Sequence, residues 1–224
     1  ETNENDNIVI SDAVVINQAN LVLSDVTAPA LLWAGGQFEM SWRVTNAGEI
    51  WADGIWHDAV YLSDDDQPGT DTLLESFVRP NALDVGLSYD QSVNITIPGV
   101  PNGQYWLVYV ADNENQLGET SDTLVLGPFT IERPNLIVSN LVPPLEGWTG
   151  EQIVLGWTTE NNGPVPASGS WMDLVYLSTD AQAGNDILLD EIGRPAELPA
   201  TGHYDQNAIV SIPLGITPGD YWLI

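Results

Sequence analysis

The chain has no cysteine, no lysine and only two histidines among its 224 residues. The missing thiols exclude disulfides and thiolate metal sites. A zinc site of three histidines is excluded by number alone. His57 and His203 also occupy different positions in the repeat described below, so neither belongs to a duplicated site.

Long apolar runs and catalytic motifs are also missing. No run approaches the roughly 18 apolar residues of a membrane-spanning helix, and no signal peptide opens the sequence. The sequence has no GxSxG nucleophile motif and no glycine-rich phosphate loop. We therefore predict no membrane insertion and no enzymatic activity.

Positive charge is scarce. The sequence has 32 acidic residues and four arginines, which gives a formal net charge of −28. A surface of this sign repels nucleic acids and anionic membranes, so neither is expected as a partner. Because 43% of the residues are apolar and nine are tryptophan, the composition argues against disorder. The sequence therefore predicts a folded acidic protein.

Two stretches of the chain nearly repeat each other. "DAVYLSDDDQPGTDTLLES" begins at Asp58 and "DLVYLSTDAQAGNDILLDE" begins at Asp173, an offset of 115 positions. The same offset aligns Asn20 to Pro98 with their counterparts without a gap, and one extra residue then precedes Tyr221. Self-similarity of this length indicates a duplicated module.

The repeat predicts the domain boundaries. The first complete unit runs from about residue 20 to 131, residues 132–134 form a linker, and the second unit covers 135–224. The second unit has no counterpart of the last strand of the first. Residues 1–19 resemble the end of the first unit, so we interpret them as the closing strand of a preceding repeat, or as a donor strand. We expect the chain to be one segment of a longer array of such units.

Each unit is predicted to be all-β. "QFEMSWRVT" places apolar side chains at every second position, and "QIVLGWTT" and "QSVNITIP" do the same. Turn clusters such as "NAGE", "PNG" and "TPGD" separate these runs. About seven short strands over roughly 110 residues indicate an immunoglobulin-like β-sandwich.

Four motifs carry a family resemblance. "NLIVS", "WRVTNAG", "WMDLVYLSTDAQAGNDILL" and "PNGQYWL" occur in the order expected for one unit, taken from either copy. Both units, roughly residues 20–224, resemble the CARDB module, the cell-adhesion-related domain found in bacteria. The resemblance implies immunoglobulin-like sandwiches arranged in tandem in large secreted or surface proteins. It implies a role in adhesion, spacing or assembly, and it carries no catalytic residues.

An acidic loop recurs in both units and is a candidate Ca²⁺ site. Its repeated carboxylates stand six residues apart across a glycine turn, and they are Asp65, Asp71, Asp180 and Asp186. Such hard oxygen ligands suit Ca²⁺, although the spacing is not that of an EF-hand. A plain turn, in which aspartate accepts its own backbone amides, explains the same residues. The segment from Asp112 to Glu119 is a second, weaker candidate.

Two aspartates lie on apolar strand faces and require a partner. Alternation places Asp58 and Asp173 beside buried positions, where a lone charge is costly. Arg79 and Arg194 are equivalent in the repeat, so we predict a structural ion pair inside each sandwich, Asp58 with Arg79 and Asp173 with Arg194. The alternative is an exposed arginine without a fixed partner.

The tryptophans divide into core and surface candidates. Eight of them form four equivalent pairs, and those on strands are expected in the core. Three lie beside turns or lack a counterpart, and these candidate contact residues are Trp33, Trp51 and Trp148. They would stack on a sugar or pack between neighbouring units.

The sequence thus favours a structural or adhesion module of an extracellular or cell-surface array, acting as a spacer or fibre-forming unit. The expected partners are neighbouring repeats, other copies, or a surface glycan or protein receptor. One alternative is a Ca²⁺-dependent ligand- or glycan-binding adhesin module. Another is head-to-tail strand donation, in which "IVISDAVVI" fills the slot left in the second unit of another copy.

Overall fold

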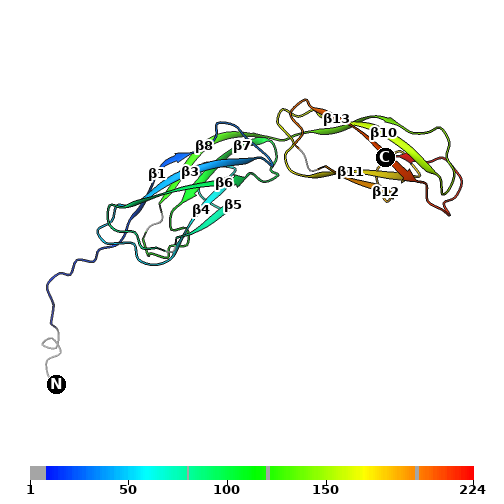
Figure 1. Cartoon of the computed structure of the whole chain (residues 1–224). Coiled ribbons are helices and arrows are strands. Elements are labelled where there is room, and N and C mark those ends of the chain that lie inside the picture. Colours follow the sequence, from blue (N-terminus) through cyan, green and yellow to red (C-terminus); the bar gives the residue numbers. More distant parts are fainter. Residues whose placement is uncertain (1–8, 80, 120–121, 195–196) are drawn as a thin grey trace, which may run out of the picture. The chain divides into compact units, whose positions relative to one another are not determined.

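The computed structural model describes residues 9–79, 81–119, 122–194 and 197–224. These residues form fourteen β-strands and no α-helix. None of their elements is a helix long and apolar enough to cross a membrane. By strand pairing the chain divides into a first module (β1–β8) and a second module (β9–β14), which share no sheet in the part described (Figure 1).

The first module contains two sheets, one ordered β1-β3-β6 and the other β2-β8-β7-β4-β5. Alternating residues of β3 are buried, as its apolar period predicts. The strands are β1 (Leu21–Thr27), β2 (Leu32–Trp33), β3 (Gln37–Asn46), β4 (Trp56–Ser63), β5 (Thr72–Arg79), β6 (Ser88–Thr96), β7 (Gly103–Val110) and β8 (Thr123–Glu132).

The second module repeats this arrangement with fewer strands. Its sheets are ordered β13-β10-β9 and β12-β11-β14, and Figure 1 shows them as two layers. The strands are β9 (Leu136–Val142), β10 (Gln152–Asn161), β11 (Trp171–Ser178), β12 (Ile187–Arg194), β13 (His203–Ser211) and β14 (Trp222–Leu223).

Both modules are immunoglobulin-like β-sandwiches. The seven strands expected per unit become eight in the first module, because β2 forms a short parallel pair with β8, and six in the second. Tyr105 donates its hydroxyl to the carbonyl of Pro101 at 3.2 Å, and Tyr221 donates to that of Thr217 at 2.8 Å. Both bonds have the tyrosine-corner pattern of such sandwiches.

A buried asparagine fixes the same turn in each module. Asn46 is fully buried at the end of β3, where its side-chain amide donates to the carbonyls of Ile50 and Leu83, each at 2.9 Å. Its Oδ1 accepts the amide of Gly48 at 3.0 Å. A Cβ on Gly48 would lie 2.6 Å from the amide nitrogen of Asn20, so the close approach of the chain requires glycine.

The second module has the same construction around Asn161 and Gly163. Asn161 donates to the carbonyl of Val165 at 2.8 Å and accepts the amide of Gly163 at 3.0 Å. A Cβ on Gly163 would lie 2.6 Å from the amide nitrogen of Asn135. The repeated asparagine and glycine are therefore explained by backbone packing.

Residues 9–20 precede β1 and contain no strand. The part of the expected closing or donor strand within residues 1–8 lies outside the described residues. Five branched apolar side chains of the described part are largely exposed, namely Val9, Ile10, Val14, Val15 and Ile16.

Candidate functional site

A buried carboxylate lies at the centre of the first module. Asp58 stands in β4 between two sheet neighbours, β5 and β7, and only 1% of it is exposed. The hydroxyl of Tyr89, in β6 of the opposite sheet, donates to its Oδ2. The amide of Asp112 donates to its Oδ1 at 3.4 Å. The carboxylate thus links the two sheets and the loop after β7.

Burial raises the pKa of Asp58, while the Tyr89 hydroxyl, the Asp112 amide and the charge of Arg79 oppose the increase. Burial, together with the neighbouring carboxylate, also raises the pKa of Tyr89. The phenol therefore stays protonated and acts as a donor.

Arg79 does not form the predicted direct ion pair with Asp58. Among the described residues no ion pair within 4 Å joins them. The guanidinium instead lies over the ring of Tyr89, with Cζ 3.5 Å from the ring centroid, and donates to Gln91 Oε1 at 3.1 Å. The tyrosine satisfies the carboxylate with a short neutral donor, and the arginine acts on Asp58 through a longer electrostatic contact.

In the second module the equivalent residues are in direct contact. Arg194 Nε lies 3.8 Å from Asp173 Oδ2, and its Cζ lies 3.8 Å from the ring centroid of Tyr204. The hydroxyl of Tyr204 donates to Asp173 at 2.8 Å, and the indole of Trp157 donates at 3.3 Å. Arg194 Nε and Nη2 are buried without a hydrogen-bond partner in the part of the chain described.

Sequence reasoning paired each aspartate with an arginine, and the two lie on adjacent strands of one sheet, but it missed the tyrosines of the opposite sheet. The missing signal was present, because "YDQ" recurs at Tyr89 and Tyr204. A tyrosine that repeats with a buried aspartate on a facing strand is a candidate donor for that carboxylate. The centre of each module is therefore an Asp–Tyr–Arg cluster. Asp58 is buried in the first module, whereas Asp173 lines the apolar groove of the second module that is described below.

The repeated acidic loops are hydrogen-bonded turns. Asp65 Oδ1 accepts the amide of Gln67 at 2.8 Å, and Asp71 Oδ2 accepts the amide of Gly69 at 3.0 Å. Equivalent bonds of 2.8 Å join Asp180 to Gln182 and Asp186 to Gly184 in the second module. Across the residues described, no three His, Asp or Glu side chains form a group suited to a metal ion. This geometry is the one expected of plain turns.

The second candidate loop also uses its carboxylates to hold backbone amides. Asp112 accepts from Gln116 at 2.8 Å and from Leu117 at 2.9 Å. Glu119 accepts the amide of Leu21 in β1 at 2.8 Å through one oxygen and at 3.0 Å through the other. Burial raises the pKa of Glu119, with a smaller contribution from nearby carboxylates. This loop ties β1 to the end of the sandwich.

The three candidate contact tryptophans have different environments. Trp33 is half-buried and packs edge-on against Phe38, with ring centroids 4.6 Å apart. Trp51 is 55% exposed and Trp148 is 67% exposed. Trp42, Trp56 and Trp157 belong to the core, as predicted, whereas Trp171 is only partly buried.

An apolar groove of about 510 Å³ lies in the second module, lined by residues of β9, β10, β11 and β14. In the first module, β7 pairs with β4 from Ala59 to Ser63. In the second module, β14 pairs with β11 at Leu177 and Ser178, and Ile224 directly after β14 exchanges two backbone hydrogen bonds with Tyr176. The groove therefore lies beside the part of β11 that no strand flanks on this edge in the described residues.

The comparisons with known proteins agree with this architecture. A model of the CARDB family matches residues 18–123. This segment is a CARDB domain. The match spans β1 to β7 and the start of β8, and the second module is its internal repeat. No curated protein matches the chain.

Solved structures similar to this chain include a CARDB domain from Pyrococcus furiosus in complex with di-metal ions. It is 16% identical, with a TM-score of 0.38, over 53% of this chain and 97% of that chain. Red sea bream transglutaminase is 11% identical, with a TM-score of 0.32, over 90% of this chain and 28% of that chain. Trypsin-activated alpha-2-macroglobulin from Escherichia coli is 14% identical, with a TM-score of 0.27, over 85% and 13%.

Proposed function

We propose that the chain is a non-enzymatic spacer and adhesion segment of an extracellular or cell-surface protein built from tandem repeats. It acts through contacts with neighbouring repeats or with other copies. The observation that carries the proposal is the duplication of the sandwich from its first strand to the start of β7, including its Asp–Tyr–Arg centre. Duplicated units with their own cores are the construction principle of extended repeat proteins.

The polar clusters support a structural role. The buried carboxylates accept hydrogen bonds from tyrosine and backbone donors, and the surface aspartates of the loops hold turn amides. Groups committed in this way stabilise the sandwich and leave no nucleophile beside a base in a cleft. The proposal accordingly assigns neither catalysis nor Ca²⁺ to these residues.

Single-molecule pulling of the chain tests the spacer role. We expect two separate unfolding events, each releasing about 3.3–3.6 Å of contour length per residue of its own module. The second module should open at lower force because, in the described part of the chain, only residues 176–178 of β11 are paired on this edge, whereas residues 59–63 of β4 pair with β7 in the first module. A single event that spans both modules would contradict the assignment of independent repeats.

Strand donation between copies is a second candidate. Residues 9–16 expose apolar side chains, and the groove of about 510 Å³ offers an apolar surface beside an unflanked strand. An added strand would pair with β11 by its backbone. Sedimentation of the intact chain and of a variant without residues 1–19 tests this, since donation requires polymers of the first and not of the second.

A further inference from the structure

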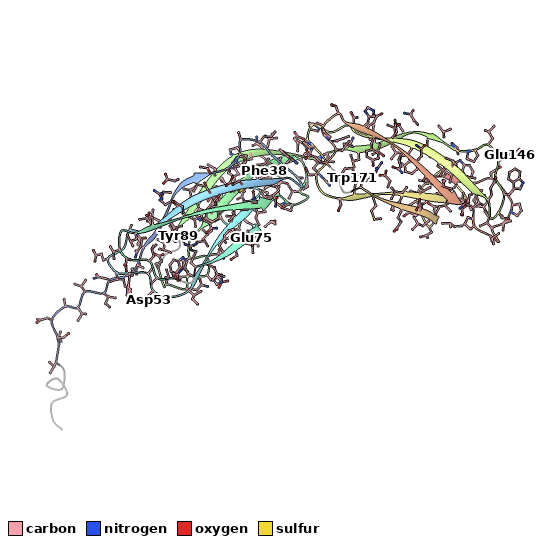
Figure 2. All side chains as sticks on the ribbon, viewed as in Figure 1. Phe38, Asp53, Glu75, Tyr89, Glu146 and Trp171 are labelled. Carbon is pink, nitrogen blue, oxygen red and sulfur yellow. The ribbon has the colours of Figure 1, made fainter. Side chains whose placement is uncertain are left out.

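One end of the first module carries a pocket of about 220 Å³ that the spacer role does not use. Its walls are residues 17–19, the loop 50–53 and Leu117. Figure 2 shows Asp53 at the end of this module where the N-terminal segment joins it. Sites for drug-sized ligands measure about 300–1,000 Å³, so this pocket is sized for a single side chain or a small group.

Backbone hydrogen bonds hold both walls in place. The amide of Glu49 donates to the carbonyl of Gln18 at 3.3 Å. Ala52 and Leu83 exchange two backbone hydrogen bonds, each of 2.9 Å, which anchor the loop to the strand-like segment opposite. Because the backbone of both walls is fixed, binding does not require the loops themselves to become ordered.

The pocket presents an aromatic face and a carboxylate that the fold does not use. Trp51 is 55% exposed and, within the described residues, has no hydrogen bond or ring contact. Asp53 is exposed and likewise has no hydrogen bond or ion pair there. This differs from the buried and loop carboxylates described above, which all accept donors. Both residues are therefore available to a ligand.

The second module lacks these groups at the equivalent positions. Pro166 replaces Trp51, Ser168 replaces Asp53, and Arg133 replaces Gln18. Trp51 is the one tryptophan of the chain without a counterpart in the repeat. The part of the fold that the two modules share thus does not require an indole here, and the pairing of Trp51 with Asp53 is specific to the first module.

We propose that this pocket binds a protonated amine on an aliphatic stem, the chemistry of a lysine side chain on a partner protein. The indole face attracts a cation through its quadrupole, and Asp53 supplies the opposite charge. Ile50, Ala52 and Leu117 line the pocket as apolar surface for the stem. The net charge of −28 favours the approach of a basic partner.

A neutral sugar is the competing ligand, because it would stack on the same indole and use the side-chain amides of Asn17 and Gln18. A neutral ligand would gain no affinity from the negative potential of the acidic surface and little from the charge of Asp53. The unused carboxylate and the charge of the chain therefore favour the amine. This inference adds a ligand site to the spacer and does not rest on it, since pulling and ligand titration give separate readouts.

The test is an NMR titration of the whole chain with ¹⁵N-labelled tryptophan. The Trp51 indole signal is the one absent from Trp51→Phe. We expect saturable displacement of this signal by Nα-acetyl-lysine amide, and at least a severalfold weaker response in 0.5 M salt. The Nε-acetylated derivative, which keeps the stem and removes the charge, should give no displacement at the same concentration.

Variants locate the site. Asp53→Asn should weaken binding about two- to fivefold, the range of an exposed ion pair. Trp148→Phe is the matched control, because Trp148 is exposed outside the pocket and its loss should leave binding unchanged. Equal displacement by the acetylated derivative, displacement by a methyl glucoside alone, or no displacement by the amine at 50 mM would each overturn the proposal.

Discussion

Asp58 in the first module and Asp173 in the second occupy equivalent strand positions, yet they are stabilised by different neighbours. Asp58 is covered by the loop after β7, whose Asp112 amide donates to it, and its arginine lies beyond the tyrosine ring. Asp173 has no such loop donor among the described residues and lies 3.8 Å from its arginine. Only the tyrosine hydroxyl bond is common to both.

The comparison shows which contact of the cluster the two modules share. A buried carboxylate needs donors, and the tyrosine is supplemented by the Asp112 amide at Asp58 and by the Trp157 indole at Asp173. Where β7 and its loop cover the strand, the charge is held by hydrogen bonds. Where the strand edge is open, the arginine approaches more closely. The predictions below test this difference, and hydrogen exchange of peptides from each module reports the two stabilities separately.

The largest difference is expected at the core tryptophan before the aspartate. Trp56 is 1% exposed, whereas its equivalent Trp171 is only partly buried. Trp56→Ala should cost about 3–5 kcal/mol of unfolding free energy, and Trp171→Ala should cost less because less area leaves the core. Equal losses measured by exchange of β3 and β10 peptides would show that the two cores are equally closed.

The arginines should differ next. Arg194→Met removes the near charge from Asp173 and should cost about 1–3 kcal/mol, less than a fully buried pair because two of its own nitrogens already lack partners. Arg79→Met should cost about 1 kcal/mol or less, since it removes the contact with the Tyr89 ring and one hydrogen bond to the Gln91 side chain. The reverse order would mean that distance to the carboxylate does not decide the effect.

The sequence alone predicted the sandwich fold, its duplication and the burial of Asp58. The alternation in β3 and β10, the turn residues and the 115-residue offset led to the sandwich fold and its duplication. Burial of Asp58 followed from the same alternation. The identity of its partner did not, because alternation fixes which face a residue occupies but not which donor across the core approaches closest.

The pocket at Trp51 was also predicted only in part from the sequence. The repeat marked Trp51 as unmatched, and its place near a turn predicted exposure, which the structure bears out. Asn17, Gln18 and Asp53 were not predicted beside it. They are brought together by the hydrogen bonds of residues 18 and 49 and of Ala52 with Leu83, contacts between segments far apart in the sequence.

A smaller effect is expected on acidification of the first module. Burial raises the pKa of Asp58 and of Glu119, so the folded state holds these protons more tightly than the unfolded state. The contribution of these two groups to the stability should be greatest below their unfolded pKa values of about 3.9 and 4.3 and should fall as the pH rises through them toward the raised folded values. The groups facing these carboxyls are Tyr89, Arg79, Asp112 and Asp122.

Unfolding measured from pH 4 to 7 in the intact chain checks this pH dependence. Asp58→Asn combined with Glu119→Gln should flatten the profile of the first module. The second module, followed in the same samples, reports how far neutralisation of the net charge alone changes stability. An unchanged slope in the double variant would place the pH dependence elsewhere.

The smallest effect is expected at the loop aspartates, where the two modules should behave alike. Asp65→Asn and Asp180→Asn keep an oxygen that accepts the turn amide, so each should change stability by no more than about 0.5 kcal/mol. Millimolar Ca²⁺ should act no differently from Mg²⁺ on either module, because the four carboxylates already hold their own turns. A bound ion at 100 times its Kd would stabilise by about 2.7 kcal/mol. A Ca²⁺-specific increase in stability of that size, lost in the double variant Asp65→Asn with Asp71→Asn, would show that the loop of the first module binds Ca²⁺. The two loops would then differ in function.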